Sequence, residues 1–213
     1  MPTRADIVAA FTQVRLIPIL AVDTEDQALR TSECLLNAGL KVLELTLRTP
    51  AALQATAAVC RRFPEVIVGV GTVLSAAQLR ATQEAGAQFA FSPGLTPQLA
   101  TDAQASGFPF FPGVSSASAL MLALEHGFDV LKLFPTEAVG GVKLARALGE
   151  PFPGVKFCAT GGVSPSNVHE YLAQPNIACV GGSWVCRPQA IRAGDWAGIR
   201  QAAQEAVALL QDI

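Results

Sequence analysis

Short apolar runs rich in β-branched and aromatic residues alternate with helix-patterned segments along this chain. The apolar runs cover residues 16–22, 41–47, 66–70, 88–91, 108–111, 130–134, 155–160 and 178–181. The clearest helical segments between them cover residues 24–38, 51–62, 75–85, 96–106 and 116–126. Four of these are followed by a glycine suited to a helix C-cap, namely Gly39, Gly86, Gly107 and Gly127. Strands that alternate with helices predict βαβ units and a parallel sheet.

The number of these units predicts how the sheet is arranged. Eight units of about 25 residues fit a compact α/β fold, the (β/α)8 or TIM barrel, as a single domain over residues 1–213 with an N-terminal helix. A doubly wound open sheet is the alternative. The turn after the first run, Val22-Asp23-Thr24-Glu25, lacks the glycines of a dinucleotide-binding turn and so disfavours it. With 51% hydrophobic and 15% charged residues, the chain has enough apolar material for one large core.

One charged residue interrupts the sixth apolar run. Lys132 stands between Leu131 and Leu133, where a lysine is rarely buried without a partner or a task. Desolvation disfavours the ammonium form, so a lysine held there supplies a reactive neutral amine, which a Schiff-base nucleophile requires. The alternative interpretation is a lysine at a strand end whose amine reaches water.

The second run carries a carboxylate among apolar residues. Alternation along a strand places Val42, Glu44, Thr46 and Arg48 on one face and three leucines on the other. We expect the leucines to contact outer helices, so that Glu44 points into the barrel, either paired with Arg48 or another cation or used in proton transfer. The same alternation turns Lys132 inward. A Schiff-base lyase needs at least an amine that acts as the nucleophile and a carboxylate that transfers protons, and these two inward side chains supply both.

Polar groups and glycines also follow other runs, at the barrel end where active sites form. After the third run, Gly71 allows close approach of backbone or ligand and Thr72 supplies a hydroxyl, while Ser75 is the better candidate for the next helix cap. Glycine pairs follow the seventh run (Gly161, Gly162) and end the eighth run. A lone glycine pair is usually only a turn, but two pairs at these positions predict a phosphate site.

Charge, histidine and cysteine content narrow the kinds of partner. A net charge of -2 and a pI near 5.7 offer no basic surface for nucleic acid, and the early apolar run is too short to cross a membrane. Residues 1–12 lack the apolar segment of a secretory signal. The two histidines, His126 and His169, lie in helical contexts, so no histidine-built zinc site is expected. Five scattered cysteines without a Cys-x-x-Cys pair indicate reduced core thiols and a cytoplasmic location.

Seven short motifs are spread from the second run to the eighth. They are VLELTLRT (42–49), VGVGTVL (68–74), FSPGLT (91–96), KLFP (132–135), GGVK (140–143), TGGVSP (160–165) and GGSW (181–184). Together they resemble the bacterial 2-keto-3-deoxy-6-phosphogluconate (KDPG) aldolases, class I lyases of the Entner–Doudoroff pathway in the KDPG/4-hydroxy-2-oxoglutarate (KHG) aldolase family. The resemblance covers nearly the whole chain.

The resemblance implies roles for ten residues. Lys132 would form an imine with the substrate, and Glu44 would transfer protons. The pyruvyl end would be bound and the pocket shaped by Arg48, Thr72, Pro93 and Phe134. The phosphate would be bound by Gly161, Gly162, Gly182 and Ser183. It further implies a phosphorylated keto-acid substrate cleaved to pyruvate and glyceraldehyde 3-phosphate, a covalent imine without metal or other cofactor, and a homotrimer.

Three alternatives remain open. The enzyme could prefer the galactonate epimer or KHG, although galactonate relatives tend to carry Pro-Leu-Asn where this chain has Thr46-Leu47-Arg48. A phosphate-binding barrel epimerase or isomerase would use the same glycine loops without needing an inward lysine. A sugar-phosphate sensor would have no reason to bury a lysine opposite a glutamate. Three residues differ from those usual in the family. Val70 and Thr136 stand where alanine is common, and Val139 stands where asparagine is common. These positions lie beside the site, so the differences bear on substrate specificity rather than on the reaction.

Overall fold

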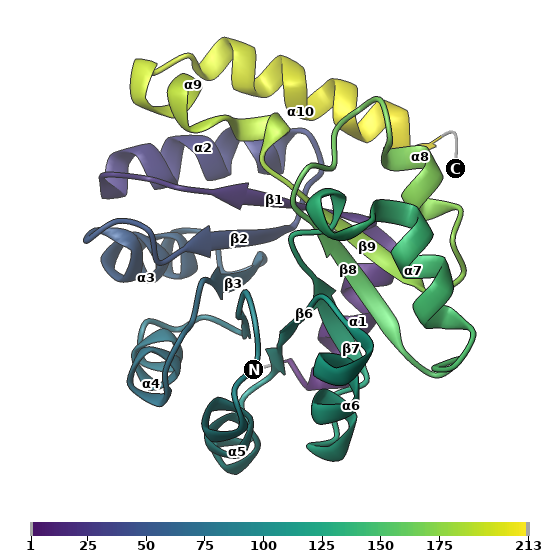
Figure 1. Ribbon diagram of the computed structural model, residues 1–213. Helices are drawn as coiled ribbons and strands as arrows, with labels where there is room; N and C mark the ends of the chain where they lie inside the picture. The colour runs from purple at the N-terminus through teal and green to yellow at the C-terminus, as the bar shows by residue number, and fades with distance from the viewer. Residues whose placement is uncertain (1, 212–213) are drawn as a thin grey trace.

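The computed structural model describes residues 2–211, and one sheet of nine parallel strands lies at the centre of that part of the chain (Figure 1). The strands are β1 (Leu16–Leu20), β2 (Val42–Thr46), β3 (Ile67–Gly71), β4 (Phe89–Phe91), β5 (Phe110–Phe111), β6 (Gly113–Val114), β7 (Val130–Leu133), β8 (Lys156–Thr160) and β9 (Ile177–Gly182). Their order is β5-β4-β3-β2-β1-β9-β8-β7-β6. Every pairing is parallel, as the alternating pattern predicts.

The predicted eight-unit barrel is present, with its fifth strand divided in two. β5 pairs with β4 and β6 pairs with β7, and only Pro112 separates them, so these two pieces bring the ends of the sheet together. A proline has no N–H to donate, which interrupts a strand. Its carbonyl still accepts a hydrogen bond from the Lys132 N–H (2.9 Å). The expected fifth strand over residues 108–111 was therefore wrong in its bounds, because Gly113 and Val114 form the ladder with β7.

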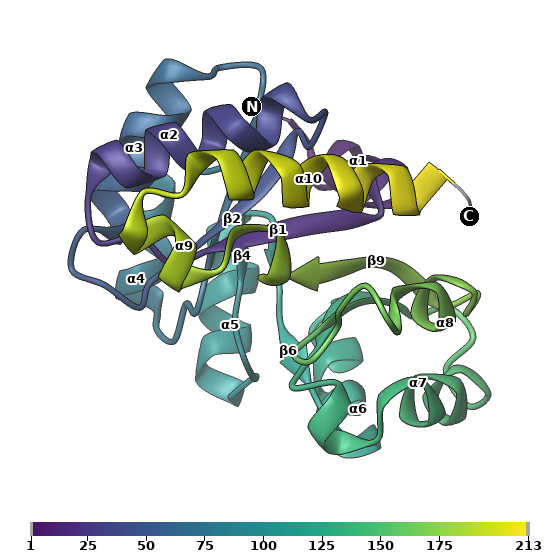
Figure 2. The same ribbon diagram turned by 90° about the horizontal axis from the view of Figure 1, so that it is seen from above.

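After the N-terminal helix, the helices surround the strands in chain order (Figure 1). They are α1 (Arg4–Val14), α2 (Glu25–Asn37), α3 (Ala52–Arg62), α4 (Ala76–Glu84), α5 (Pro97–Ser106), α6 (Ala117–Glu125), α7 (Gly141–Gly149), α8 (Val168–Leu172), α9 (Pro188–Ala193) and α10 (Trp196–Gln211), with 3-10 turns η1 (Glu137–Val139) and η2 (Trp184–Cys186). Figure 2 shows α10 alongside α2, against which it packs. Within residues 2–211, no helix is both long and apolar enough to cross a membrane.

The predicted helix boundaries have a local cause. The side chains of Thr24 and Ser75 accept hydrogen bonds from the N–H groups of Gln27 and Gln78, and so satisfy donors that a helix start leaves free. The glycines expected to end four helices all have positive φ, as a left-handed cap requires.

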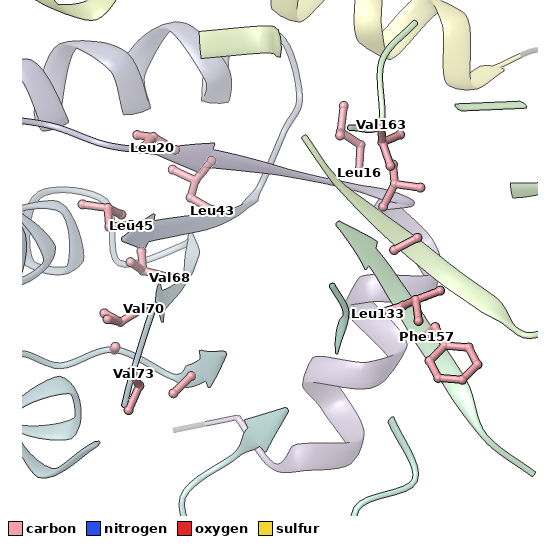
Figure 3. Packing of buried hydrophobic residues seen from close by; sticks show 14 of the residues in the cluster. Leu16, Leu20, Leu43, Leu45, Val68, Val70, Val73, Leu133, Phe157 and Val163 are labelled. Atoms are coloured by element: carbon pink, nitrogen blue, oxygen red, sulfur yellow. The ribbon is translucent and has the colours of Figure 1, made fainter. Parts of the chain in front are cut away.

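Two buried clusters pack the two faces of the sheet. The outer cluster holds Leu43 and Leu45 of β2, which pack with apolar residues of α2 and α3 as the alternation predicts, and Figure 3 shows these side chains on the strands. The inner cluster includes Phe11 of α1, whose ring centroid lies 5.0 Å from those of Phe89 and Phe111. The predicted N-terminal helix thus helps to fill the barrel interior with aromatic rings.

Candidate active site

A buried ion pair joins opposite sides of the barrel. Lys132 Nζ on β7 lies 2.9 Å from Glu44 Oε1 on β2, and the two residues are only 6% and 1% exposed. The prediction that both side chains face the interior is confirmed. The alternative of an amine reaching water is wrong, and so is the pairing of Glu44 with Arg48. An ion pair in a low-dielectric interior is costly unless both charges are well partnered, so this pair is a candidate for chemistry.

Glu44 is held close to the backbone of β3. A Cβ built on Gly71 would lie 1.8 Å from Glu44 Oε1, so the carboxylate occupies the space that any larger residue at position 71 would need. This is the close approach that the sequence predicted at Gly71, and the approaching group is the carboxylate. The second oxygen, Oε2, is buried and has no hydrogen-bond partner within residues 2–211. Glu44 therefore has one oxygen paired with the amine and one available to accept a proton.

Two aromatic rings and two cysteines lie near the Lys132 amine. Lys132 Nζ lies 5.0 Å from the ring centroid of Phe91 and 5.6 Å from that of Phe134. The faces of such rings stabilise a nearby cation, whether an ammonium or a protonated imine. Cys158 is the β8 partner of Lys132 and lies opposite Cys179 of β9. Burial, together with Cys158, raises the pKa of the Cys179 thiol, so the Cys179 thiol is uncharged at neutral pH.

The residues expected at the pyruvyl end follow their strands, but one expectation was wrong. Arg48 lies in a turn beyond β2 and is exposed, so the strand alternation that placed it on the Glu44 face ends at Thr46. The Thr46 hydroxyl donates to the Leu20 carbonyl (3.1 Å), and the Arg48 N–H donates to the Thr46 carbonyl (2.7 Å), which turns the chain. Pro93 is half-buried in the loop after β4.

Thr72 adopts a backbone conformation that is rare for its residue type. Its φ is +67°, in the left-handed region that a β-branched residue enters at a cost on the order of 1–3 kcal/mol. The residue directly follows β3 and is half-buried, while Ser75 caps α4 as predicted. Strain of this kind is commonly retained where a side chain must be aimed at a ligand.

The glycine pair after β8 presents donors at the same end of the barrel. Gly161 and Gly162 both have positive φ, +98° and +90°. The N–H groups of Gly161, Gly162 and Val163 donate to none of the backbone carbonyls of residues 2–211. Ser183 follows β9 directly and is exposed. Free amides at a strand end can bind an anion, and the phosphate site expected at these residues stays a prediction.

Several neighbouring residues were missed by sequence reasoning. Phe91, the ring nearest Lys132, was recognised only as part of a strand, although its inward register follows from the alternation of β4. Glu137 and Tyr171 meet beside the Gly161–Gly162 pair, and nothing local in the sequence connects two residues 34 positions apart. Among the described residues, no group of three His, Cys, Asp or Glu side chains is placed to hold a metal ion.

Comparison with known proteins agrees with this geometry. The family model "KDPG and KHG aldolase" matches residues 7–202. The KHG/KDPG aldolase of Escherichia coli K12 is 45% identical over 192 residues, which are 90% of each chain. Two solved structures are also similar, and both are KDPG aldolases. That of Legionella pneumophila, with pyruvate captured as a covalent carbinolamine, has a TM-score of 0.90 at 41% identity and covers 93% of this chain and 96% of that one. That of Zymomonas mobilis, with 3-phosphoglycerate, has a TM-score of 0.86 at 40% identity and covers 95% of both chains. The chain belongs to the KDPG and KHG aldolase family.

Proposed function

We propose that this protein is a class I aldolase that cleaves 2-keto-3-deoxy-6-phosphogluconate to pyruvate and glyceraldehyde 3-phosphate, and that it also cleaves 4-hydroxy-2-oxoglutarate. The observation that carries the proposal is the buried Lys132–Glu44 pair, with 2.9 Å between Nζ and Oε1. A nucleophilic amine in contact with a proton acceptor fits imine chemistry. The pyruvate carbinolamine of the Legionella enzyme and the name of the E. coli relative support the same chemistry and both substrates.

In the proposed reaction the amine adds to the substrate first. Glu44 takes a proton from Lys132, and the neutral Nζ attacks the C2 ketone to give a carbinolamine. Glu44 returns its proton to the carbinolamine hydroxyl, which leaves as water and gives a protonated imine. The positive charge of this imine is stabilised by the rings of Phe91 and Phe134. This cation draws electrons from the C3–C4 bond, so that cleavage need not expel a free carbanion. The chain's own lysine supplies this electron sink, and we propose no metal or other cofactor.

Glu44 then directs the proton movements. Its unpartnered oxygen, Oε2, accepts the proton of the C4 hydroxyl, directly or through a water. The C3–C4 electrons pass into the imine as an enamine while glyceraldehyde 3-phosphate leaves. Protonation of the enamine at C3 and hydrolysis of the imine release pyruvate and return the Lys132 amine.

The two ends of the substrate have separate binding groups in this proposal. Arg48 and Thr72 bind the pyruvyl carboxylate, Arg48 because a guanidinium can hold a carboxylate through two hydrogen bonds. Its exposed position at the end of β2 requires the side chain to turn back toward the barrel. Pro93 shapes the pocket beside them. Gly182, whose Cβ position is filled by the ring of Trp184, and Ser183 complete a phosphate site with Gly161 and Gly162.

A turnover assay tests the function. Purified protein is mixed with KDPG, with its galactonate epimer and with KHG, and the release of pyruvate is followed with lactate dehydrogenase. We expect turnover of KDPG to exceed that of the epimer, because Thr46-Leu47-Arg48 replaces the Pro-Leu-Asn of galactonate relatives. Faster cleavage of the epimer would assign the chain to that specificity. Absence of pyruvate from all three would contradict an aldolase.

Ser183 offers a direct test of the phosphate site. We expect Ser183→Asp to lower kcat/KM strongly for KDPG and little for KHG, which has no phosphate, because the new carboxylate repels the phosphate. Ser183 is exposed with φ −96°, so an aspartate fits without strain. Gly162 is a poorer probe, because a Cβ there would lie 2.5 Å from Glu137 Cγ. Thr12→Asp, at an exposed position of α1, is the matched control. Equal losses on both substrates would point to general misfolding, and no loss on either would place the phosphate elsewhere.

We propose that the protein assembles as a homotrimer. The resemblance to KDPG aldolases implies it, and the exposed apolar side chains of Leu74 (58%) and Met121 (54%) are consistent with surfaces covered in an assembly. We expect light scattering at micromolar concentration to give three times the chain mass of 22.2 kDa. A mass equal to one chain would contradict the prediction.

The remaining expectations concern organisation and location. We propose that residues 1–213 act as one catalytic domain, since a single sheet includes strands from β1 to β9. We propose a cytoplasmic location because the five cysteines are free, as is usual in reducing compartments.

A further inference from the structure

The loop between β7 and α7 lies directly against the Gly161–Gly162 pair. The Thr136 N–H donates to the Thr160 carbonyl (2.8 Å), and the Glu137 N–H donates to the Gly161 carbonyl (3.0 Å). The side chain of Glu137 fills the position that a Cβ at Gly162 would need, with Cγ at 2.5 Å and Cβ at 2.6 Å. Position 162 therefore requires a glycine, both for its positive φ and because a larger side chain would meet Glu137. The Glu137 side chain packs directly against Gly162.

A buried tyrosine holds Glu137 in this position. Tyr171 of α8 is fully buried, and its hydroxyl donates a hydrogen bond to Glu137 Oε1. The Thr136 hydroxyl in turn donates to the Tyr171 oxygen (3.4 Å). Burial, and then the bond to Glu137, raises the pKa of Tyr171 to about 12, so it is a neutral donor at physiological pH. Glu137 itself is exposed, so its carboxylate would be free to move without this bond.

We propose that Tyr171 is a positioning residue for the substrate phosphate, acting through Glu137. Two consecutive residues with positive φ have wide conformational freedom, and their N–H groups bind an anion well only when that freedom is removed. Glu137 packs on Gly162, and Asn167 Nδ2 donates to the Gly162 carbonyl (3.2 Å). The hydrogen bond from Tyr171 also holds the negative charge of Glu137 in one position, and that position affects the binding of a doubly charged phosphate.

The same network connects the phosphate site to the reacting amine. Thr136 and Glu137 follow Lys132 by only four and five residues, on the loop that begins where β7 ends. A phosphate bound at Gly161 and Gly162 is thereby placed at a fixed distance from Lys132. The phosphate is remote from the reacting bond, and the free energy of its binding should raise kcat/KM as well as affinity.

Removal of one hydroxyl tests the proposal, which rests on the phosphate site proposed above. We expect Tyr171→Phe to lower kcat/KM for KDPG by about 10- to 100-fold, the usual effect of losing a hydrogen bond to a charged group, with little change for KHG. Inhibition by 3-phosphoglycerate should weaken by a similar factor. Glu137→Ala should reproduce the loss, whereas Glu137→Gln, which keeps an acceptor oxygen, should restore most of the activity. Thr56→Val is the matched control, because it removes a buried hydroxyl that bonds within α3 (2.8 Å).

A double variant separates positioning from general packing. If Tyr171 acts through its bond to Glu137, Tyr171→Phe combined with Glu137→Ala should lose no more than Glu137→Ala alone. Additive losses, or equal losses with KDPG and KHG, would overturn the proposal. If Tyr171→Phe fails to fold, Glu137→Ala at its exposed position tests the same bond. A selective loss in Ser183→Asp without one in Tyr171→Phe or Glu137→Ala would reject this inference alone. Unchanged activity of Ser183→Asp on both substrates would reject the phosphate site and this inference with it.

Discussion

Treatment of the protein with pyruvate and borohydride is expected to leave one stable adduct, on Lys132. Of the four lysines, only Lys132 faces the barrel interior. Lys41 precedes β2 and is exposed, Lys143 is exposed on α7, and Lys156 begins β8 at the opposite barrel end, where its Nζ donates to the Pro175 carbonyl (2.8 Å). Peptide mapping by mass spectrometry locates the adduct. An adduct on any other lysine, or none, would contradict an imine at Lys132.

The variant Lys132→Met should lose both the adduct and the activity. Without the amine no imine forms, and we expect kcat to fall on the order of 10⁴-fold or more, as when other enzymes lose a covalent nucleophile. Lys156→Met is the control and should keep near-normal turnover. Because the change leaves Glu44 buried without its partner, thermal unfolding must show that the variant is folded. Mapping of the adduct on the unaltered protein tests the assignment without a variant.

Glu44→Gln should separate imine formation from bond cleavage. We expect trapping with pyruvate to persist to some degree, while cleavage of KDPG falls by roughly 10²- to 10⁴-fold, the usual contribution of a general acid or base. Glutamine has the shape of glutamate and fits over Gly71, so the fold should be retained. Glu84→Gln, on the exposed end of α4, is the control. Near-normal cleavage by Glu44→Gln would make Glu44 a structural partner of Lys132.

The order of elements and the inward faces could be read from local patterns. Period-two alternation places Glu44 and Lys132 inward because successive side chains on a strand point to opposite faces. Cap residues such as Thr24 and the glycines after the helices mark boundaries, because each acts within three or four residues of its own position. These rules stop at strand ends. They placed Arg48 on the Glu44 face, although hydrogen bonds of the following turn decide its direction.

Which of these groups meet depends on how distant segments pack together. Lys132 and Glu44 are 88 residues apart, and closure of the barrel, not any local preference, brings their side chains to 2.9 Å. The same closure sets the carboxylate over Gly71 and carries the β7 ladder across the break at Pro112. The bond between Tyr171 and Glu137 likewise depends on how α8 packs beside the loop after β7. Sequence fixes backbone preferences over a few residues, whereas contacts between distant segments are selected by the packing of the whole chain. Local patterns thus specify the barrel strands and turn one amine and one carboxylate inward, whereas the packing of the closed barrel makes these two groups a pair.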